Sequence, residues 1–242
     1  MLHYIRKGSG HPLVLVHGFL GSHEMFHLVM DSLSNHFEVI AVDLPGHGKS
    51  VVDKNSYSIV DYANAIVEVL EHEGIKEASW LGNSLGGYIT LAALAENLAP
   101  IKKAILLNSS VSADTEEAKE KRTKQQGTIK DNGVDAFVDE VIKNFFGENA
   151  SPQTVETGCT IAKEATVEGL TLALDAMKHR PTRQNYIDVT SIPILIIEGD
   201  EDKVVAPIKT NNVNVKKVII ESGHSGMLED VDGVLQAIYE FL

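Results

Sequence analysis

Two kinds of segment alternate along this chain. Short apolar runs, typical of strands buried on both faces of a parallel sheet, are followed by stretches whose apolar residues recur at helical spacing. The predicted strands span residues 3–7, 12–16, 37–43, 78–81, 103–107, 192–197 and 217–220, and the predicted helices between them span 25–33, 59–72, 85–95 and 227–242. This alternation predicts an α/β fold in which helices flank a mostly parallel sheet on both faces.

The alternation stops between the fifth and sixth predicted strands. Residues 112–187 contain no convincing strand, and their pattern predicts four helices, at 116–126, 134–146, 152–165 and 167–177. The first break falls at Gly127. Helices inserted there predict a cap over the carboxyl edge of the sheet, where ligand sites of α/β proteins form. The expected organisation is a core of residues 1–111 and 188–242 and a helical cap of residues 112–187.

Composition excludes several classes of function. A formal net charge of −13 over 242 residues argues against nucleic acid as a partner and against an anionic membrane surface. No apolar run approaches the roughly 20 residues of a membrane-spanning helix, and the first residues lack the apolar centre of a signal peptide. The single cysteine, Cys159, rules out an internal disulfide, so we expect a cytoplasmic protein. Monomer and homodimer both remain open.

One stretch carries a candidate nucleophile. Gly82-Asn83-Ser84-Leu85-Gly86 runs from a predicted buried strand directly into a predicted helix. So tight a turn forces its middle residue into a strained backbone conformation and leaves no room for a Cβ atom at either glycine. The strain would lift the Ser84 hydroxyl out of the sheet edge and into a cleft.

A serine hydroxyl needs a histidine base and an acid that orients the histidine. In α/β sheets these follow later strands, in the order serine, acid, histidine. His224 follows the last predicted strand. Three acids, at positions 200–202, follow the strand before it. Asp200 is placed to close the turn, Glu201 to face solvent, and Asp202 to orient His224 from a loop that ends where Pro207 begins a predicted helix.

An oxyanion hole completes this chemistry, because the developing negative charge needs preorganised donors. The backbone N–H groups of Leu85 and of Phe19, in the loop after the second strand, are the expected donors. His17 and His47 are expected to hold loop backbone through their ring nitrogens. The candidate histidine and acids follow the order of a serine triad, so we expect neither metal nor cofactor.

The chain resembles the α/β-hydrolase-fold superfamily over essentially its whole length, in its serine carboxylesterase-like branch. The matching motifs are His17-Gly18-Phe19, Asp43-Leu44-Pro45-Gly46-His47-Gly48-Lys49-Ser50, Gly82-Asn83-Ser84-Leu85-Gly86-Gly87, Gly199-Asp200-Glu201-Asp202 and Gly223-His224. The resemblance implies a triad of Ser84, Asp202 and His224, and its pattern of glycine, two variable residues and aspartate also selects Asp202. A serine nucleophile excludes the haloalkane dehalogenase and epoxide hydrolase branches, which carry aspartate.

The resemblance implies a carboxylesterase-like enzyme acting on a small to medium ester, with Phe19, Tyr88, Phe145 and Met227 as expected substrate contacts. Three alternatives remain. The menaquinone-pathway synthase, a lyase, is similar at residues 17–22 but has arginine where this chain has Tyr88. Carbon–carbon bond hydrolases are similar at residues 82–84 but carry a tryptophan shortly after the histidine, where this chain has Ser225-Gly226-Met227-Leu228. Ligand receptors of the same fold keep an intact triad.

Overall fold

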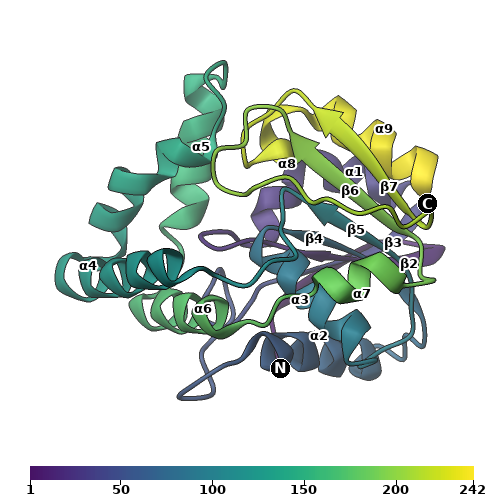
Figure 1. Cartoon of the computed structure of the whole chain (residues 1–242), viewed down its shortest axis with the longest axis horizontal. Coiled ribbons are helices and arrows are strands. Elements are labelled where there is room, and N and C mark those ends of the chain that lie inside the picture. The colour runs from purple at the N-terminus through teal and green to yellow at the C-terminus, as the bar shows by residue number, and fades with distance from the viewer.

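A computed structural model describes residues 1–242 and contains one seven-stranded sheet (Figure 1). Its strands are β1 (Tyr4–Gly8), β2 (His11–Val16), β3 (Phe37–Val42), β4 (Ala78–Asn83), β5 (Ile101–Leu107), β6 (Ile194–Gly199) and β7 (Val215–Ile220). They lie in the order β1-β3-β2-β4-β5-β6-β7. Only β1 is antiparallel to its neighbour. The predicted mostly parallel sheet is therefore confirmed, and the carboxyl ends of β2 to β7 meet at one edge.

Helices cover both faces of the sheet (Figure 1). On one face lie α1 (His27–Ser34) and α9 (Val231–Phe241), and on the other lie α2 (Ile59–His72), α3 (Leu85–Ala95) and α7 (Gln184–Val189). Ser58 caps α2, in a capping box with Asp61. The central strand β4 is wholly buried, and its Trp80 is the largest fully buried side chain. This packing fixes β4 and α3, the two elements that meet at Ser84.

The segment between β5 and β6 contains only helices, as predicted. Besides α7, these are α4 (Glu116–Val141), the 3₁₀ helix η2 (Ile142–Phe145), α5 (Pro152–Ala162) and α6 (Val167–His179), and these four project from one end of the sheet (Figure 1). The predicted break at Gly127 is wrong, because α4 continues through it. The break lies at Gly133, with φ of 82°. An interior glycine costs a helix only about 1 kcal/mol, so Gly127 does not end it.

Three other local predictions differ from the structure. Pro207 begins no helix, since residues 203–214 form a loop rich in asparagine, which favours turns over helix. The predicted last helix is two, α8 (Gly226–Glu229) and α9, because the Asp230 side chain accepts the Gly233 N–H and caps α9. Helix α7 was not predicted, and it spans the expected boundary at residues 187–188. No helix has both the length and the apolar character to cross a membrane.

Candidate active site

Ser84 lies alone between the end of β4 and the start of α3. Its φ of 50° and ψ of −113° lie in a strained region for a residue with a side chain. A Cβ atom on Gly82 would lie 2.2 Å from the Gly86 carbonyl oxygen, and one on Gly86 would lie 2.1 Å from that of Val16. The predicted strain at the serine and the steric need for both glycines are thus confirmed.

The three side chains predicted from different strand ends lie in one hydrogen-bonded chain. The Ser84 Oγ lies 2.8 Å from His224 Nε2, and His224 Nδ1 lies 2.8 Å from Asp202 Oδ2. The His224 and Asp202 side chains are only 2% and 5% exposed. An imidazole that donates from Nδ1 to a carboxylate presents the Nε2 lone pair to the serine hydroxyl. The arrangement is therefore that of a nucleophile, a base and an orienting acid.

The electrostatic environment keeps Asp202 ionised. Burial by itself would raise the pKa of Asp202, but hydrogen bonds from His224, from the Val204 N–H and from Asn108 outweigh it and hold the pKa below the usual 3.8. The Val204 N–H donates to Oδ1 at 2.8 Å, while His224 and Asn108 share Oδ2. A charged carboxylate in this position stabilises an imidazolium on His224.

Asn108 is a site residue that sequence reasoning missed. It follows β5, and its Nδ2 donates to Asp202 Oδ2 at 3.1 Å and to the Gly223 carbonyl at 3.0 Å. Its φ of 47° is in the left-handed region, which asparagine tolerates better than most residues. The sequence did hold one signal for Asn108: it is an asparagine directly after a strand whose carboxyl end faces the site. Asn108 therefore joins the loop that carries Asp202 (the acid loop) to the loop that carries His224 (the histidine loop).

The helical insertion covers the serine closely. A cavity of only about 20 Å³ remains beside Ser84 and His224, and Phe19 and Phe145 are among its lining residues. The Phe145 carbonyl accepts a 2.9 Å hydrogen bond from the His224 N–H. The ring of Phe145 also packs edge-on against the imidazole, with centroids 5.4 Å apart. The insertion therefore contacts the histidine directly.

The Glu229 carboxylate joins the insertion above Ser84 to the loop that carries His224. Glu229 of α8 accepts the N–H of Gly147 at 2.7 Å, of Gly223 at 3.2 Å and of Ser225 at 3.1 Å. Gly147 belongs to the insertion, whereas Gly223 and Ser225 flank His224. Glu229 thus holds both sides of the histidine and the segment above it, a role that the sequence did not reveal.

A family model described as the alpha/beta hydrolase fold matches residues 11–138, more than half of the chain. The chain belongs to the alpha/beta hydrolase fold family. It is 26% identical over 203 residues to the (E)-2-((N-methylformamido)methylene)succinate hydrolase of Acinetobacter baylyi, which covers 83% of this chain and 76% of that protein.

Solved structures resemble this alpha/beta hydrolase over its full length. A thermophilic esterase from Thermogutta terrifontis, solved with malate bound, superposes with a TM-score of 0.92 at 26% identity and covers 99% of this chain and 92% of its own. MenH from S. aureus superposes with a TM-score of 0.86 at 22% identity, covering 100% and 98%. The second likeness shows the shared fold alone.

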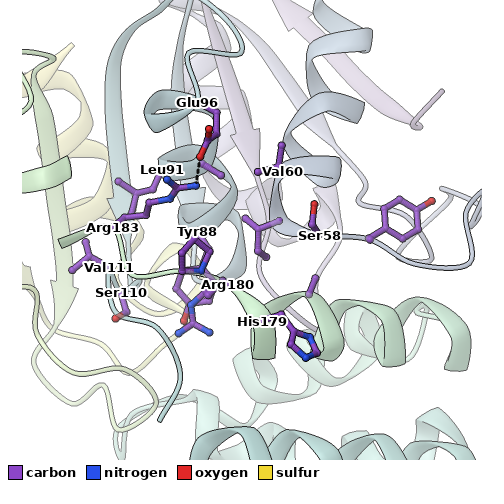
Figure 2. A pocket seen from close by; sticks show the side chains of 15 residues that line it. Ser58, Val60, Tyr88, Leu91, Glu96, Ser110, Val111, His179, Arg180 and Arg183 are labelled. Carbon is purple, nitrogen blue, oxygen red and sulfur yellow. Dashed lines mark hydrogen bonds and ion pairs between the residues drawn. The ribbon is translucent and has the colours of Figure 1, made fainter. Parts of the chain in front are cut away.

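The other residues predicted for the hydrolase site lie in different surroundings. Tyr88 lines a separate cavity, whose other lining residues come from the start of α2, from α3 and from the end of α6 (Figure 2). Met227 is fully buried in α8 and lines neither that cavity nor the one at Ser84, because its side chain packs into the core. Among the predicted substrate contacts, only Phe19 and Phe145 face the space beside Ser84.

The two acids beside Asp202 make contacts of their own. Asp200 Oδ1 accepts the Ser222 N–H at 3.1 Å, so it joins the loop after β6 to the loop after β7 instead of closing its own turn as expected. Glu201 does not simply face solvent. Its Oε2 accepts the Glu148 N–H at 2.5 Å, because the insertion folds back over the acid loop. Asp202 is the one acid of the three that contacts His224.

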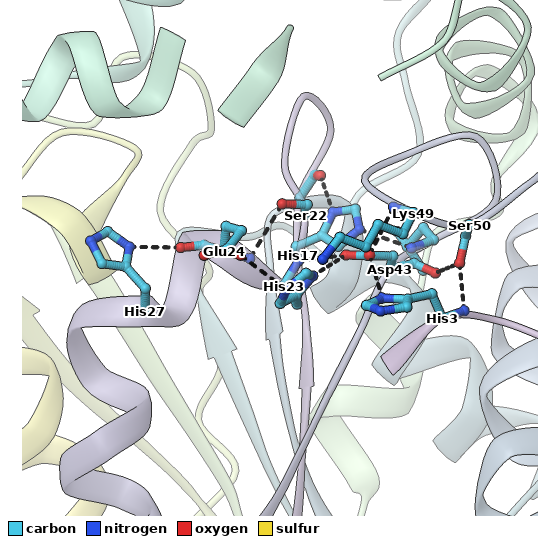
Figure 3. Close-up of polar contacts among 11 residues, drawn as sticks. His3, His17, Ser22, His23, Glu24, His27, Asp43, Lys49 and Ser50 are labelled. Atoms are coloured by element: carbon cyan, nitrogen blue, oxygen red, sulfur yellow. Dashed lines mark hydrogen bonds and ion pairs between the residues drawn. The ribbon is translucent and has the colours of Figure 1, made fainter. Parts of the chain in front are cut away.

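A second cluster of histidines supports the loops of the hydrolase core beside the serine (Figure 3). Asp43, at the end of β3, accepts the His23 Nδ1 and N–H on Oδ1, and the His3 Nδ1 and Lys49 N–H on Oδ2. The potential metal-ligand atoms of His3, His23 and Asp43 lie within 4.8 Å of one another. Each carboxylate oxygen already accepts two hydrogen bonds, so these contacts explain the cluster without an ion.

His17 and His47 hold loop backbone, as predicted. His17 Nδ1 donates to the Gly18 carbonyl at 2.7 Å, and its Nε2 accepts the Leu44 N–H at 2.9 Å. Burial lowers the pKa of His17 to about 3 and that of His47 to about 4. Protonation of His17 at Nε2 would set an N–H against the Leu44 N–H. Both imidazoles are therefore neutral in the folded protein.

These two histidines are expected to make folding stability fall on acidification. Because their pKa values are lower folded than unfolded, where they are about 6.5, the unfolded chain takes up more protons below pH 6.5. The free energy of unfolding should fall by about 1.4 kcal/mol per pH unit for each histidine between about pH 6 and 4. The opposite shift of His23, whose pKa its hydrogen bond to Asp43 raises, acts only above about pH 6.5.

Urea unfolding at pH 7, 6 and 5 measures this slope. His47→Asn should remove about half of it, since one of the two buried imidazoles is gone. A free energy of unfolding that is constant from pH 7 to 5 would contradict the assignment of neutral buried imidazoles.

Proposed function

We propose that this alpha/beta hydrolase is a serine hydrolase that cleaves a small to medium carboxylic ester through an acyl-enzyme. The hydrogen-bonded chain from Ser84 Oγ through His224 to Asp202, at 2.8 Å per contact, carries the proposal. The likeness to the Thermogutta terrifontis esterase, at 26% identity, supports it. The reaction needs no group beyond this chain's own side chains, backbone and water.

In the first half of the reaction, His224 Nε2 accepts the Ser84 hydroxyl proton as Oγ attacks the ester carbonyl carbon. Asp202 stabilises the resulting imidazolium. The C–O bond then breaks as His224 donates its proton to the leaving alcohol. In the second half, His224 takes a proton from water, the hydroxide attacks the acyl carbonyl, and the proton returns to Ser84 as the acid leaves.

The backbone N–H groups of Phe19 and Leu85 are proposed as the oxyanion hole. The Phe19 N–H donates no hydrogen bond in the folded chain, and Leu85 is the first residue of α3, where N–H groups have no partner within the helix. A Cβ atom on Gly18 would lie 3.0 Å from Ser84 Cβ, so this loop lies against the serine. Each such donor contributes roughly 3 kcal/mol to transition-state stabilisation.

A series of 4-nitrophenyl esters from acetate to octanoate tests the proposal. Sustained turnover with a maximum at one chain length is expected of an esterase. A single slow turnover followed by tight retention of the ligand would instead identify a receptor, and the proposal would fail. The Acinetobacter baylyi relative is named as the hydrolase of a succinate derivative, and the Thermogutta terrifontis esterase was solved with malate bound, and both compounds are dicarboxylates. Esters with a free acid group therefore belong in the series.

A further inference from the structure

A second cavity, of about 280 Å³, lies between the start of α2, the outer face of α3 and the segment that follows α6 (Figure 2). Ile59, Leu91 and Val111 contribute to its apolar wall, and Arg180 and Tyr88 lie at one end. Its volume is just below the range typical of small-molecule sites, roughly 300–1,000 Å³.

The cavity begins close to the candidate nucleophile, although Ser84 does not line it. Tyr88 is one helical turn beyond Ser84, about 5–6 Å along α3. Ser110, which also lines the cavity, follows Ser109, whose hydroxyl donates to the Ser84 carbonyl at 2.8 Å. The space at Ser84 itself, about 20 Å³, holds little more than one water molecule. The remote part of a substrate must therefore extend beyond it.

Arg180 offers a free donor edge at this cavity. Its guanidinium stacks on the Tyr88 ring, 4.1 Å from the centroid, and its side chain is 8% exposed. Its hydrogen bonds leave from Nη1 alone, to Asp114 Oδ1 at 2.6 Å and to the Met177 carbonyl at 2.8 Å. The buried Nε has no partner. Parallel N–H groups on Nε and Nη2 match the two oxygens of a carboxylate.

The charge at this end of the cavity is positive. Asp114, with a side chain only 4% exposed, pairs with Arg180 and also with Arg122, so one carboxylate faces two guanidinium groups. The other charged pair in the wall, Arg183 with Glu96 at 2.7 Å, is neutral as a pair. In a chain of net charge −13, a buried cluster with one excess positive charge favours an anionic ligand group.

We propose that this cavity binds the carboxylate-bearing end of the substrate, with the acid on the Nε–Nη2 edge of Arg180 and the carbon chain along the apolar wall. This inference rests on the proposed function, because it assigns the acid group to the ester that Ser84 attacks. The substrate class is then an ester whose acyl or alcohol part ends in a free carboxylate.

Arg180→Gln, assayed with two esters of similar length, tests the proposal. For mono-4-nitrophenyl adipate, kcat/KM should fall on the order of 10- to 100-fold, the effect of losing a charged hydrogen-bonded pair. For the uncharged 4-nitrophenyl heptanoate it should change less than about threefold. Lys119→Gln is the control, since it removes a positive charge that pairs with the exposed Glu116 and does not line the cavity, and both esters should behave as with the wild type.

Arg180→Lys is a second variant, for the case in which Arg180→Gln does not fold. It keeps the positive charge beside Asp114 but lacks the planar edge of the guanidinium group. It should also lose the preference for the adipate ester. An equal loss for both esters in Arg180→Gln and Arg180→Lys, or a wild type with no preference for the charged ester, would overturn the proposal.

Equilibrium binding separates this inference from the proposed function. Calorimetric titration of Ser84→Ala with monomethyl adipate needs no turnover, so it reports on the cavity even if no ester is hydrolysed. Binding that weakens on the order of 10-fold or more in Ser84→Ala/Arg180→Gln supports the carboxylate site. Equal binding by both proteins, or no heat of binding at millimolar ligand, would reject it.

Discussion

Replacing Ser84 with alanine is expected to lower kcat for 4-nitrophenyl butyrate by at least about 10⁴-fold. Alanine lacks the Oγ that would attack the carbonyl, and loss of the nucleophile removes most of the catalysis in a triad acting as a unit. The fold should persist, because the hydroxyl's one side-chain partner is His224. The ratio of the two kcat values is obtained from initial rates, with the concentration of active sites measured independently.

Labelling by an organophosphonate identifies the nucleophile directly. The wild type should gain one adduct on Ser84 and lose ester turnover in parallel. Ser109→Ala is a suitable control, because Ser109 is a buried neighbour whose hydroxyl donates to the Ser84 carbonyl, and its labelling should persist. Substantial activity in a folded Ser84→Ala protein would remove the basis for the acyl-enzyme.

Asp202→Asn is expected to reduce kcat by about 10⁴-fold while the protein stays folded. An amide at this position no longer fixes the Nδ1–H tautomer of His224 or stabilises the imidazolium, and a loss of this size is the serine-protease precedent. Turnover of 4-nitrophenyl butyrate, measured beside the thermal unfolding midpoint, distinguishes lost chemistry from lost structure.

Asp200→Asn is the matched control, two residues away on the same loop. Asp200 bonds the Ser222 N–H and does not contact His224, so its replacement should cost at most about 1 kcal/mol of stability and leave kcat within a few-fold of the wild type. If Asp200→Asn abolished turnover in a stable protein while Asp202→Asn did not, the assignment of the orienting acid would be wrong.

The sheet and the three central side chains were predictable because local sequence carries their signals. Buried parallel strands are continuous apolar runs, and the glycines around Ser84 are required by the turn itself. Strand order then brings the residues after β6 and β7 to the same edge, so His224 follows from topology. Topology leaves three acids after β6, and the choice of Asp202 among them rested on the family pattern, because the helix expected at Pro207 does not form.

The supporting contacts were not predictable because they join segments far apart in the chain. Asn108 and Glu229 act through partners on the acid loop, the histidine loop and the insertion. Their contribution to the site depends on how those loops pack against one another, and no local sequence pattern predicts that packing. The break at Gly133 instead of Gly127 is similar, since both glycines are compatible with either backbone and tertiary packing decides between them.

Because of the hydrogen bonds around Glu229, the segment that covers Ser84 cannot move without affecting His224. Residues 145–147 both close the space above Ser84 and bond to the histidine loop, through the Phe145 carbonyl and the Gly147 N–H. Lifting this segment to admit a substrate larger than the present space breaks both contacts at once. Substrate entry would therefore remove part of the hydrogen-bonded support of His224. That support would return only when residues 145–147 move back over the bound substrate.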